Sequence, residues 1–266
     1  LEPGLMAGIV ADVSDQPGAL PLLQYALTEL FEQREDSTLT LEAYQASGGV
    51  SGALGRRAEA LYDDLDVAGQ AAARQLFLRL VTLGDGTEDT RRRVLRSELE
   101  ALQGWSNTEM RGYDDPINPN NKYQLSIRTQ DSLGHSQFER IIDTFGAARL
   151  LTFDRKPETR APTVEIAHEA LLREWARLRR WIDDSHGDIR FQRLLNNAAF
   201  EWDKAGREPS YLFRGARLAQ FETWTEDSTV ALTHLEASFL ESSKQAKRKR
   251  QAEKETRRQR ELETAQ

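Results

Sequence analysis

Apolar residues recur at helical spacing along most of the chain. Between residues 20 and 31 they stand at positions 20, 23, 27, 30 and 31, which lie on one face of a helix. The same spacing predicts helices over 40–46, 53–65, 71–83, 137–147, 189–204 and 209–224, and one long helix from Thr229 that is wholly polar after Leu240. The pattern therefore indicates a mostly α-helical protein.

Three short stretches are candidate strands. Leu150–Phe153 and Thr163–Ile166 flank a polar turn that contains Pro157, so they predict a small β-hairpin, and 91–95 is a further candidate strand. After the hairpin, Leu171, Trp175, Leu178 and Ile182 are spaced by four, three and four residues. This spacing predicts one continuous helix with a buried face.

The order of these elements is that of a winged helix. Helix 137–147 takes the place of the recognition helix, and the hairpin after it takes the place of the wing. The predicted fold is a helical bundle with a winged-helix-like domain, then a C-terminal helical bundle and a long polar helix. We divide the chain into the end of a helical domain (1–45), the winged-helix-like domain (46–168), the helical bundle (169–240) and a basic linker helix (241–266). Such an order serves both DNA binding and protein regulation, so it does not decide the function.

Residues 104–135 interrupt the winged-helix-like domain. The stretch contains Asp-Asp-Pro, Asn-Pro-Asn-Asn and several glycines, which favour a polar insertion over regular structure.

Composition narrows the class of protein. The chain has 266 residues, of which 39% are hydrophobic and 30% charged, and it has no cysteine. Disulfides and cysteine-ligated zinc are therefore excluded. We find neither a signal peptide nor a long apolar run, so we expect a cytoplasmic protein. The first residue is Leu1 and not Met, which favours a segment of a longer protein.

Charge is distributed unevenly. From Lys244 to the end there are nine Lys and Arg against four Glu, so this tail carries +5, and residues 1–243 carry −12 of the total of −7. A body this acidic is a poor general nucleic-acid binder, and no nucleic-acid partner is expected. The basic tail is predicted to be a solvated linker helix. Tethering to a membrane through a segment after this tail is the alternative.

Candidate chemistry centres on His168-Glu169. A zinc protease needs a second histidine four residues after the first, but Leu172 stands there. The four histidines (135, 168, 186 and 234) have no ligand spacing, and no G-x-S-x-G supports a serine hydrolase. The chain also contains no G-x-x-x-x-G-K-[ST], so it has no phosphate-binding loop of its own.

His168 falls where the second hairpin strand is predicted to lead into a helix. The free backbone N–H groups and the positive dipole end of such a helix suit an anion, and an imidazole there could donate to a phosphate oxygen. A purely structural histidine is the other interpretation, and the residues alone leave both open.

Several segments resemble one family. The segment Pro17–Leu27 (PGALPLLQYAL) resembles the Gly-x-Pro motif of STAND-class signalling NTPases. The segment Val164–Trp175 (VEIAHEALLREW) is similar to the form that the Met-His-Asp motif takes in bacterial novel STAND NTPases, which often carry WD repeats downstream. Segments 87–93 and 212–218 are also similar to that family. The sequence has Ala167 in place of the motif's Met and Glu169 in place of its Asp, which leaves the role of Glu169 open.

The resemblance implies a signalling ATPase in which an upstream P-loop NTPase domain binds ATP or ADP with Mg. Gly18, Pro21 and His168 would be the nucleotide-binding residues of this chain, with Pro21 against the adenine and His168 at the phosphates. This chain would then close on ADP and have no catalytic residue, so it would be no enzyme by itself. A downstream sensor or repeat domain, with WD repeats as one form, and oligomerisation on activation are further expectations.

Two other functions stay open. The first is a winged-helix DNA-binding regulator, although helix 137–147 and its end offer only Arg140 and Arg149 beside Glu139 and Asp143, which is poor for phosphate contacts. The second is a helical scaffold without a ligand.

Overall fold

The computed structural model describes residues 1–14, 20–32, 34, 37–84, 86–102 and 137–264. Gly18 and the predicted insertion 104–135 lie outside the described residues. The described residues form two compact units, one within 1–100 and 137–184 and the other of 101–102 and 185–264. We describe each unit by itself. The four-part division expected from the sequence stays a prediction.

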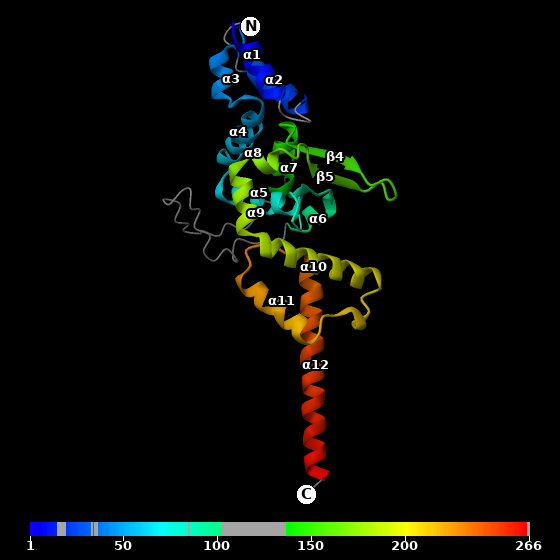
Figure 1. Ribbon diagram of the computed structural model, residues 1–266. Helices are drawn as coiled ribbons and strands as arrows, with labels where there is room; N and C mark the ends of the chain where they lie inside the picture. The colour runs from blue at the N-terminus through cyan, green and yellow to red at the C-terminus, as the bar shows by residue number, and fades with distance from the viewer. Residues whose placement is uncertain (15–19, 33, 35–36, 85, 103–136, 265–266) are drawn as a thin grey trace. The chain divides into compact units, whose positions relative to one another are not determined.

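Unit 1 begins with five helices that account for most of its first 80 residues (Figure 1). They are α1 (Leu5–Ser14), α2 (Leu20–Glu32), α3 (Leu41–Ala46), α4 (Gly49–Asp63) and α5 (Val67–Arg79). The side chain of Thr40 caps α3 by accepting the N–H of Ala43, and Asp66 caps α5 in the same way. Helix α1 was not predicted. Helix α5 ends at Arg79, and the chain enters a strand at Val81, so the prediction that this helix runs to residue 83 was wrong.

The strands of unit 1 form two antiparallel sheets. Strands β1 (Val81–Thr82) and β2 (Thr90–Arg91) pair with each other. Strands β3 (Val94–Leu95), β4 (Leu151–Arg155) and β5 (Pro162–Ile166) form a second sheet in the order β3-β5-β4. The predicted hairpin is therefore confirmed as β4–β5, whereas the single strand expected over 91–95 is divided between the two sheets. Helix α6 (Arg96–Glu100) follows β3, and α7 (Gln137–Ala147) precedes β4.

The helix predicted after His168 is broken at Trp175. Helix α8 (Leu171–Glu174) ends there and α9 (Ala176–Asp184) begins, because Trp175 has an extended backbone (φ −90°, ψ 95°). The four apolar residues of the predicted stripe are all buried, as expected, but they belong to two helices and the break between them. The prediction of one continuous helix was wrong because side-chain spacing does not detect a one-residue break.

Trp175 lies at the centre of the core of unit 1. Its ring centroid is 4.9 Å from that of Phe77, 5.4 Å from that of Trp181 and 6.3 Å from that of Tyr62, all edge to face. Edge-to-face pairs add about 0.5–1.5 kcal/mol each beyond the burial of their area. Helices α4, α5 and α9 are therefore joined through one buried side chain.

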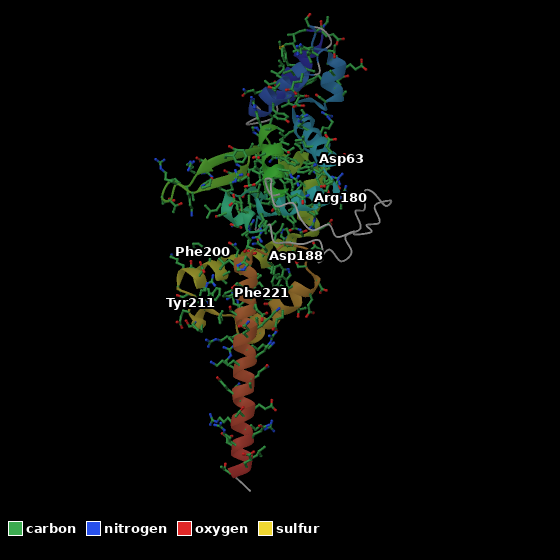
Figure 2. All side chains as sticks on the ribbon, turned by 180° about the vertical axis from the view of Figure 1, so that it is seen from behind. Asp63, Arg180, Asp188, Phe200, Tyr211 and Phe221 are labelled. Carbon is green, nitrogen blue, oxygen red and sulfur yellow. The ribbon has the colours of Figure 1, made fainter. Side chains whose placement is uncertain are left out.

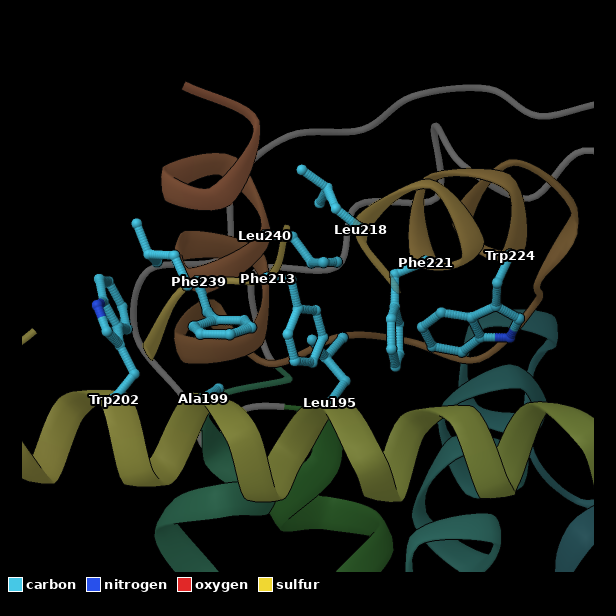
Figure 3. Packing of buried hydrophobic residues seen from close by; sticks show 10 residues of the cluster. Leu195, Ala199, Trp202, Phe213, Leu218, Phe221, Trp224, Phe239 and Leu240 are labelled. Atoms are coloured by element: carbon cyan, nitrogen blue, oxygen red, sulfur yellow. The ribbon is translucent and has the colours of Figure 1, made fainter. Parts of the chain in front are cut away.

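Unit 2 consists of α10 (His186–Lys204), a short 3-10 helix η2 (Pro209–Tyr211), α11 (Gly215–Asp227) and α12 (His234–Thr264). Figure 3 shows its core, in which Phe213, Phe221 and Phe239 pack between α10 and the two later helices; Phe213 stacks on Phe221 and meets Phe239 edge to face. The predicted helix 209–224 is thus a short turn followed by α11. The long helix begins at His234 and not at Thr229, because Thr233 caps it by accepting the N–H of Glu236.

Most of α12 is exposed. Its first turns bury Glu236, Phe239, Leu240 and Ser243 in unit 2, and residues 251–264 are all exposed. Among the helices that the structure describes, none combines the length and the apolar character needed to cross a membrane.

Candidate functional site

The three predicted nucleotide-binding residues lie in three different parts of the chain, and the structure describes two of them. Gly18 lies outside the described residues, and Pro21 belongs to the first turn of α2. His168 lies between β5 and α8, in a turn formed by residues 167–170 that we call the His168 turn. Helices α2 and α8 both pack against α4. Pro21 lies on α2, and His168 lies in the turn that precedes α8.

The His168 turn is held at its start by backbone hydrogen bonds and by Arg91. The N–H of Ala167 donates to the carbonyl oxygen of Leu150 over 2.9 Å. Arg91, from β2, donates through Nη1 to the carbonyl oxygens of Ile166 and Ala167 at 3.2 and 2.9 Å. The guanidinium group of Arg91 is therefore fixed beside His168, although the side chain remains 40% exposed.

The imidazole of His168 is half-buried. Burial first, and the positive charge of Arg91 second, lower the pKa of His168 below its ordinary value of 6.5. The ring is therefore neutral at pH 7, with one N–H to donate. An anion at this position would be attracted by Arg91 and could accept a hydrogen bond from His168.

The expected helix N-terminus is not available to an anion. Helix α8 has only four residues, too few for a substantial helix dipole. The N–H groups of Leu171, Leu172 and Arg173 already donate to carbonyl oxygens of the His168 turn at 2.9–3.0 Å. The free N–H groups predicted from the sequence are thus used within the turn. Any electrostatic attraction of an anion to this turn would therefore come from arginine side chains.

Two more arginines stand near this turn in exposed ion pairs. Arg93 lies 3.0 Å from Asp154 and 3.2 Å from Glu165, and Arg173 lies 3.0 Å from Glu88. The pairs with Asp154 and Glu88 are exposed on both sides, and such pairs contribute about 0–1 kcal/mol, whereas Glu165 is only 13% exposed. A polyanion could therefore replace Asp154 and Glu88 at little cost, but it would have to compete with Glu165.

Arg92 has a different role from the arginines beside it. Successive side chains of an extended segment point to opposite sides, so Arg92 turns inward where Arg91 and Arg93 turn outward. It donates to Glu98 at 3.1 Å and to the carbonyl oxygen of Arg79 at 3.3 Å. Arg92 thus holds the segment that contains Arg91 against the end of α5 and against α6.

A cluster of Glu59, Trp175 and Arg177, which we call the Glu59 cluster, holds the other end of α8. The carboxylate of Glu59, on α4, accepts the indole N–H of Trp175 at 2.6 Å and two nitrogens of Arg177 at 2.6–3.1 Å. Burial raises the pKa of Glu59, but the hydrogen bonds from Arg177 and Trp175 outweigh this effect, so the pKa lies below its usual value. Only the short helix α8 separates this cluster from the His168 turn.

Comparison with known protein families decides the class of this chain. The model of the family described as Novel STAND NTPase 1 matches residues 1–210. The chain belongs to this family. No curated protein and no solved structure matches it. The match covers the described residues of unit 1 and reaches through α10 into η2 of unit 2.

Membership of the Novel STAND NTPase 1 family implies a nucleotide as the ligand, and a phosphate suits the cations at the His168 turn. No group of three or more His, Asp or Glu side chains is arranged to hold a metal ion among the residues that the structure describes.

Sequence reasoning missed Arg91 and Glu59 as parts of this site. The run Arg91-Arg92-Arg93 entered only as a similarity to the family, and its alternation of side chains could have indicated which arginines face outward. No signal in the sequence pairs Glu59 with Trp175, because 116 residues separate them.

Proposed function

We propose that this chain is the regulatory, nucleotide-sensing portion of a STAND-class signalling ATPase. In this proposal an upstream P-loop NTPase domain binds ADP or ATP with Mg, and this chain closes on the ADP-bound form. The observation that carries the proposal is the His168 turn: a half-buried imidazole beside the fixed cation Arg91, in a chain of an NTPase family.

His168 would donate a hydrogen bond to a phosphate oxygen, and Arg91 would supply the positive charge. Hydrogen bonds to charged groups contribute about 1.5–3 kcal/mol. A difference of this size between the ADP and ATP states shifts an open–closed equilibrium by about ten- to a hundredfold. That range is sufficient for a switch, and the chain needs no catalytic residue of its own.

The order of elements in unit 1 is consistent with a winged-helix-like domain in which β4 and β5 are the wing. Helix α7 would be its recognition helix, but its exposed surface carries Arg140 beside Asp143, which offers little net charge to DNA. A regulatory role for this domain is therefore favoured over DNA binding, and over a scaffold without a ligand. A downstream sensor or repeat domain, such as WD repeats, and oligomerisation on activation remain parts of the proposal.

The test uses the longer protein that contains this chain together with its P-loop domain. His168→Ala should lower the amount of ADP that copurifies with the protein and raise its basal activity, with about ten- to a hundredfold weaker ADP retention. His186→Ala is the matched control, because His186 begins α10 in unit 2 and should leave ADP retention unchanged. Normal ADP content in the His168 variant would refute the proposal.

A further inference from the structure

Helix α4 connects the two elements that carry the predicted nucleotide contacts. It packs against α2, which contains Pro21, and against α8, which follows the His168 turn. Arg57 and Glu59 stand two residues apart on α4. The Nε of Arg57 lies 3.9 Å from Glu29 of α2, whereas Glu59 binds Trp175 and Arg177.

The contact of α4 with the end of α8 is tight. A side chain at Gly55 would overlap the carbonyl oxygen of Glu174, and its Cβ would lie 2.8 Å from the carbonyl carbon of that residue. One turn later on the same face, the carboxylate of Glu59 accepts hydrogen bonds from Trp175 at the helix break and from Arg177 in α9. Arg177 also stacks on Tyr62 of α4, with its guanidinium carbon 4.3 Å from the ring centroid. The backbone contact at Gly55 therefore holds the end of α8 against α4, and the charge and ring contacts hold the break and α9 there.

The contact of α4 with α2 is of another kind. The two helices pack against each other, and both carry buried apolar residues: Tyr25, Ala26 and Leu30 on α2, and Leu54 and Ala58 on α4. The distance between Arg57 and Glu29 exceeds that of a hydrogen bond. Burial raises the pKa of Glu29. Because separating these buried faces would expose apolar area to water, α2 is expected to move together with α4.

We propose that Glu59 is a positioning residue that makes α2, α4 and the His168 turn move as one body. A displacement of α2 would reach the His168 turn through the Glu59 cluster, since α8 adds only one short helical turn between them. The use of this link for nucleotide sensing rests on the function proposed above. The link itself does not, because all of its contacts exist within unit 1.

The experiment measures hydrogen exchange by mass spectrometry on the full 266-residue chain without nucleotide. In Glu59→Gln we expect amide exchange to rise about tenfold in peptides that cover α8, and several-fold in peptides that cover α2. Peptides from α5 and α7 should change less than twofold. Asp63→Asn is the matched control: Asp63, labelled in Figure 2, lies one turn further along α4, is exposed and contacts Arg177 at 3.4 Å. Asp63→Asn should leave amide exchange in both α8 and α2 unchanged.

Three outcomes would overturn the inference. They are a rise confined to α8 with α2 unchanged, an equal effect of Asp63→Asn, and a uniform rise over unit 1 that includes α5 and α7. Should Glu59→Gln fail to fold, Glu59→Asp keeps the charge, shortens the side chain by one methylene group and should give the same pattern at smaller size. Because no nucleotide is present, the result is separate from the ADP measurement on His168→Ala, and either proposal can fail alone.

Discussion

Replacing Gly55 by alanine sets two physical effects against each other. In a helix interior alanine is favoured over glycine by about 0.5–1 kcal/mol, so helix propensity alone predicts that Gly55→Ala stabilises α4. The new methyl group would instead overlap the carbonyl oxygen of Glu174 and lie 3.3 Å from the backbone nitrogen of Trp175. Both neighbours are backbone atoms, so neither can move aside as a flexible side chain would.

The steric effect should prevail. Adding a methyl group to a tightly packed contact costs about 1–3 kcal/mol. Because the overlapped atoms are backbone, the cost should be about 2–3 kcal/mol, so after subtraction of the gain in propensity we expect Gly55→Ala to lower the free energy of unfolding of unit 1 by about 1–2.5 kcal/mol. Gly187→Ala is the matched control, because Gly187 belongs to α10 and a methyl group added there would have no heavy atom within 4 Å. That variant should stabilise unit 2 by a few tenths of a kcal/mol.

Tryptophan fluorescence would mix the unfolding of the two units, because Trp175 and Trp181 belong to unit 1 and Trp202 and Trp224 to unit 2. The assay must therefore resolve the two units. Hydrogen exchange at increasing urea concentration, followed peptide by peptide, gives a free energy for each unit. Equal or greater stability of unit 1 in Gly55→Ala would refute the close contact between α4 and α8.

Three further predictions concern single side chains. Because the pKa of His168 is lower in the folded chain than its unfolded value near 6.5, its contribution to stability is complete above about pH 6.5 and is lost as the pH falls through the folded pKa. His168→Gln should therefore weaken the loss of stability between about pH 7 and pH 5 in urea titrations, and an unchanged slope would contradict the assignment. Glu236→Ala should destabilise unit 2 by about 3 kcal/mol in a denaturant titration. The reason is that the buried carboxylate of Glu236 accepts hydrogen bonds from Gln192, Asn196 and the N–H of Thr233 at 2.7–3.0 Å. The exposed control Glu241→Ala should cost less than about 0.5 kcal/mol in the same titration. Phe239→Ala should cost unit 2 about 3–5 kcal/mol in the same titration, and a cost below about 1 kcal/mol would contradict the packing in Figure 3.

Helical spacing predicted the main elements well where burial on one face decides the structure. Helix α7 and the hairpin β4–β5 agree with the predicted ranges to within two residues. Spacing could not predict the break at Trp175, because that residue is buried whether the helix continues or not. What ends α8 is a set of contacts with α4 that are distant in the sequence.

In the candidate site, too, local features could be predicted from the sequence, whereas contacts between distant segments could not. His168 was found because it stands at a local change from strand to helix, which spacing and a family motif both indicate. Its neighbour Arg91 was not, since the two meet only after β1 and β2 pair and bring Arg91 to the carbonyl oxygens at the end of β5. Gly18 lies outside the described residues, so its assignment stays a prediction.

The source of the attraction for an anion decides how a switch at this turn would behave. A helix dipole is a fixed property of the backbone, whereas an arginine side chain can change its partners. Arg91 already donates to the carbonyl oxygens of Ile166 and Ala167, and its Nε lies 3.4 Å from Glu165. A phosphate that binds here must compete with Glu165, and its loss returns Arg91 to that carboxylate. In the proposed switch, Arg91 would therefore have an anionic partner with and without the phosphate, which would keep the free-energy difference between the two states small enough for reversibility.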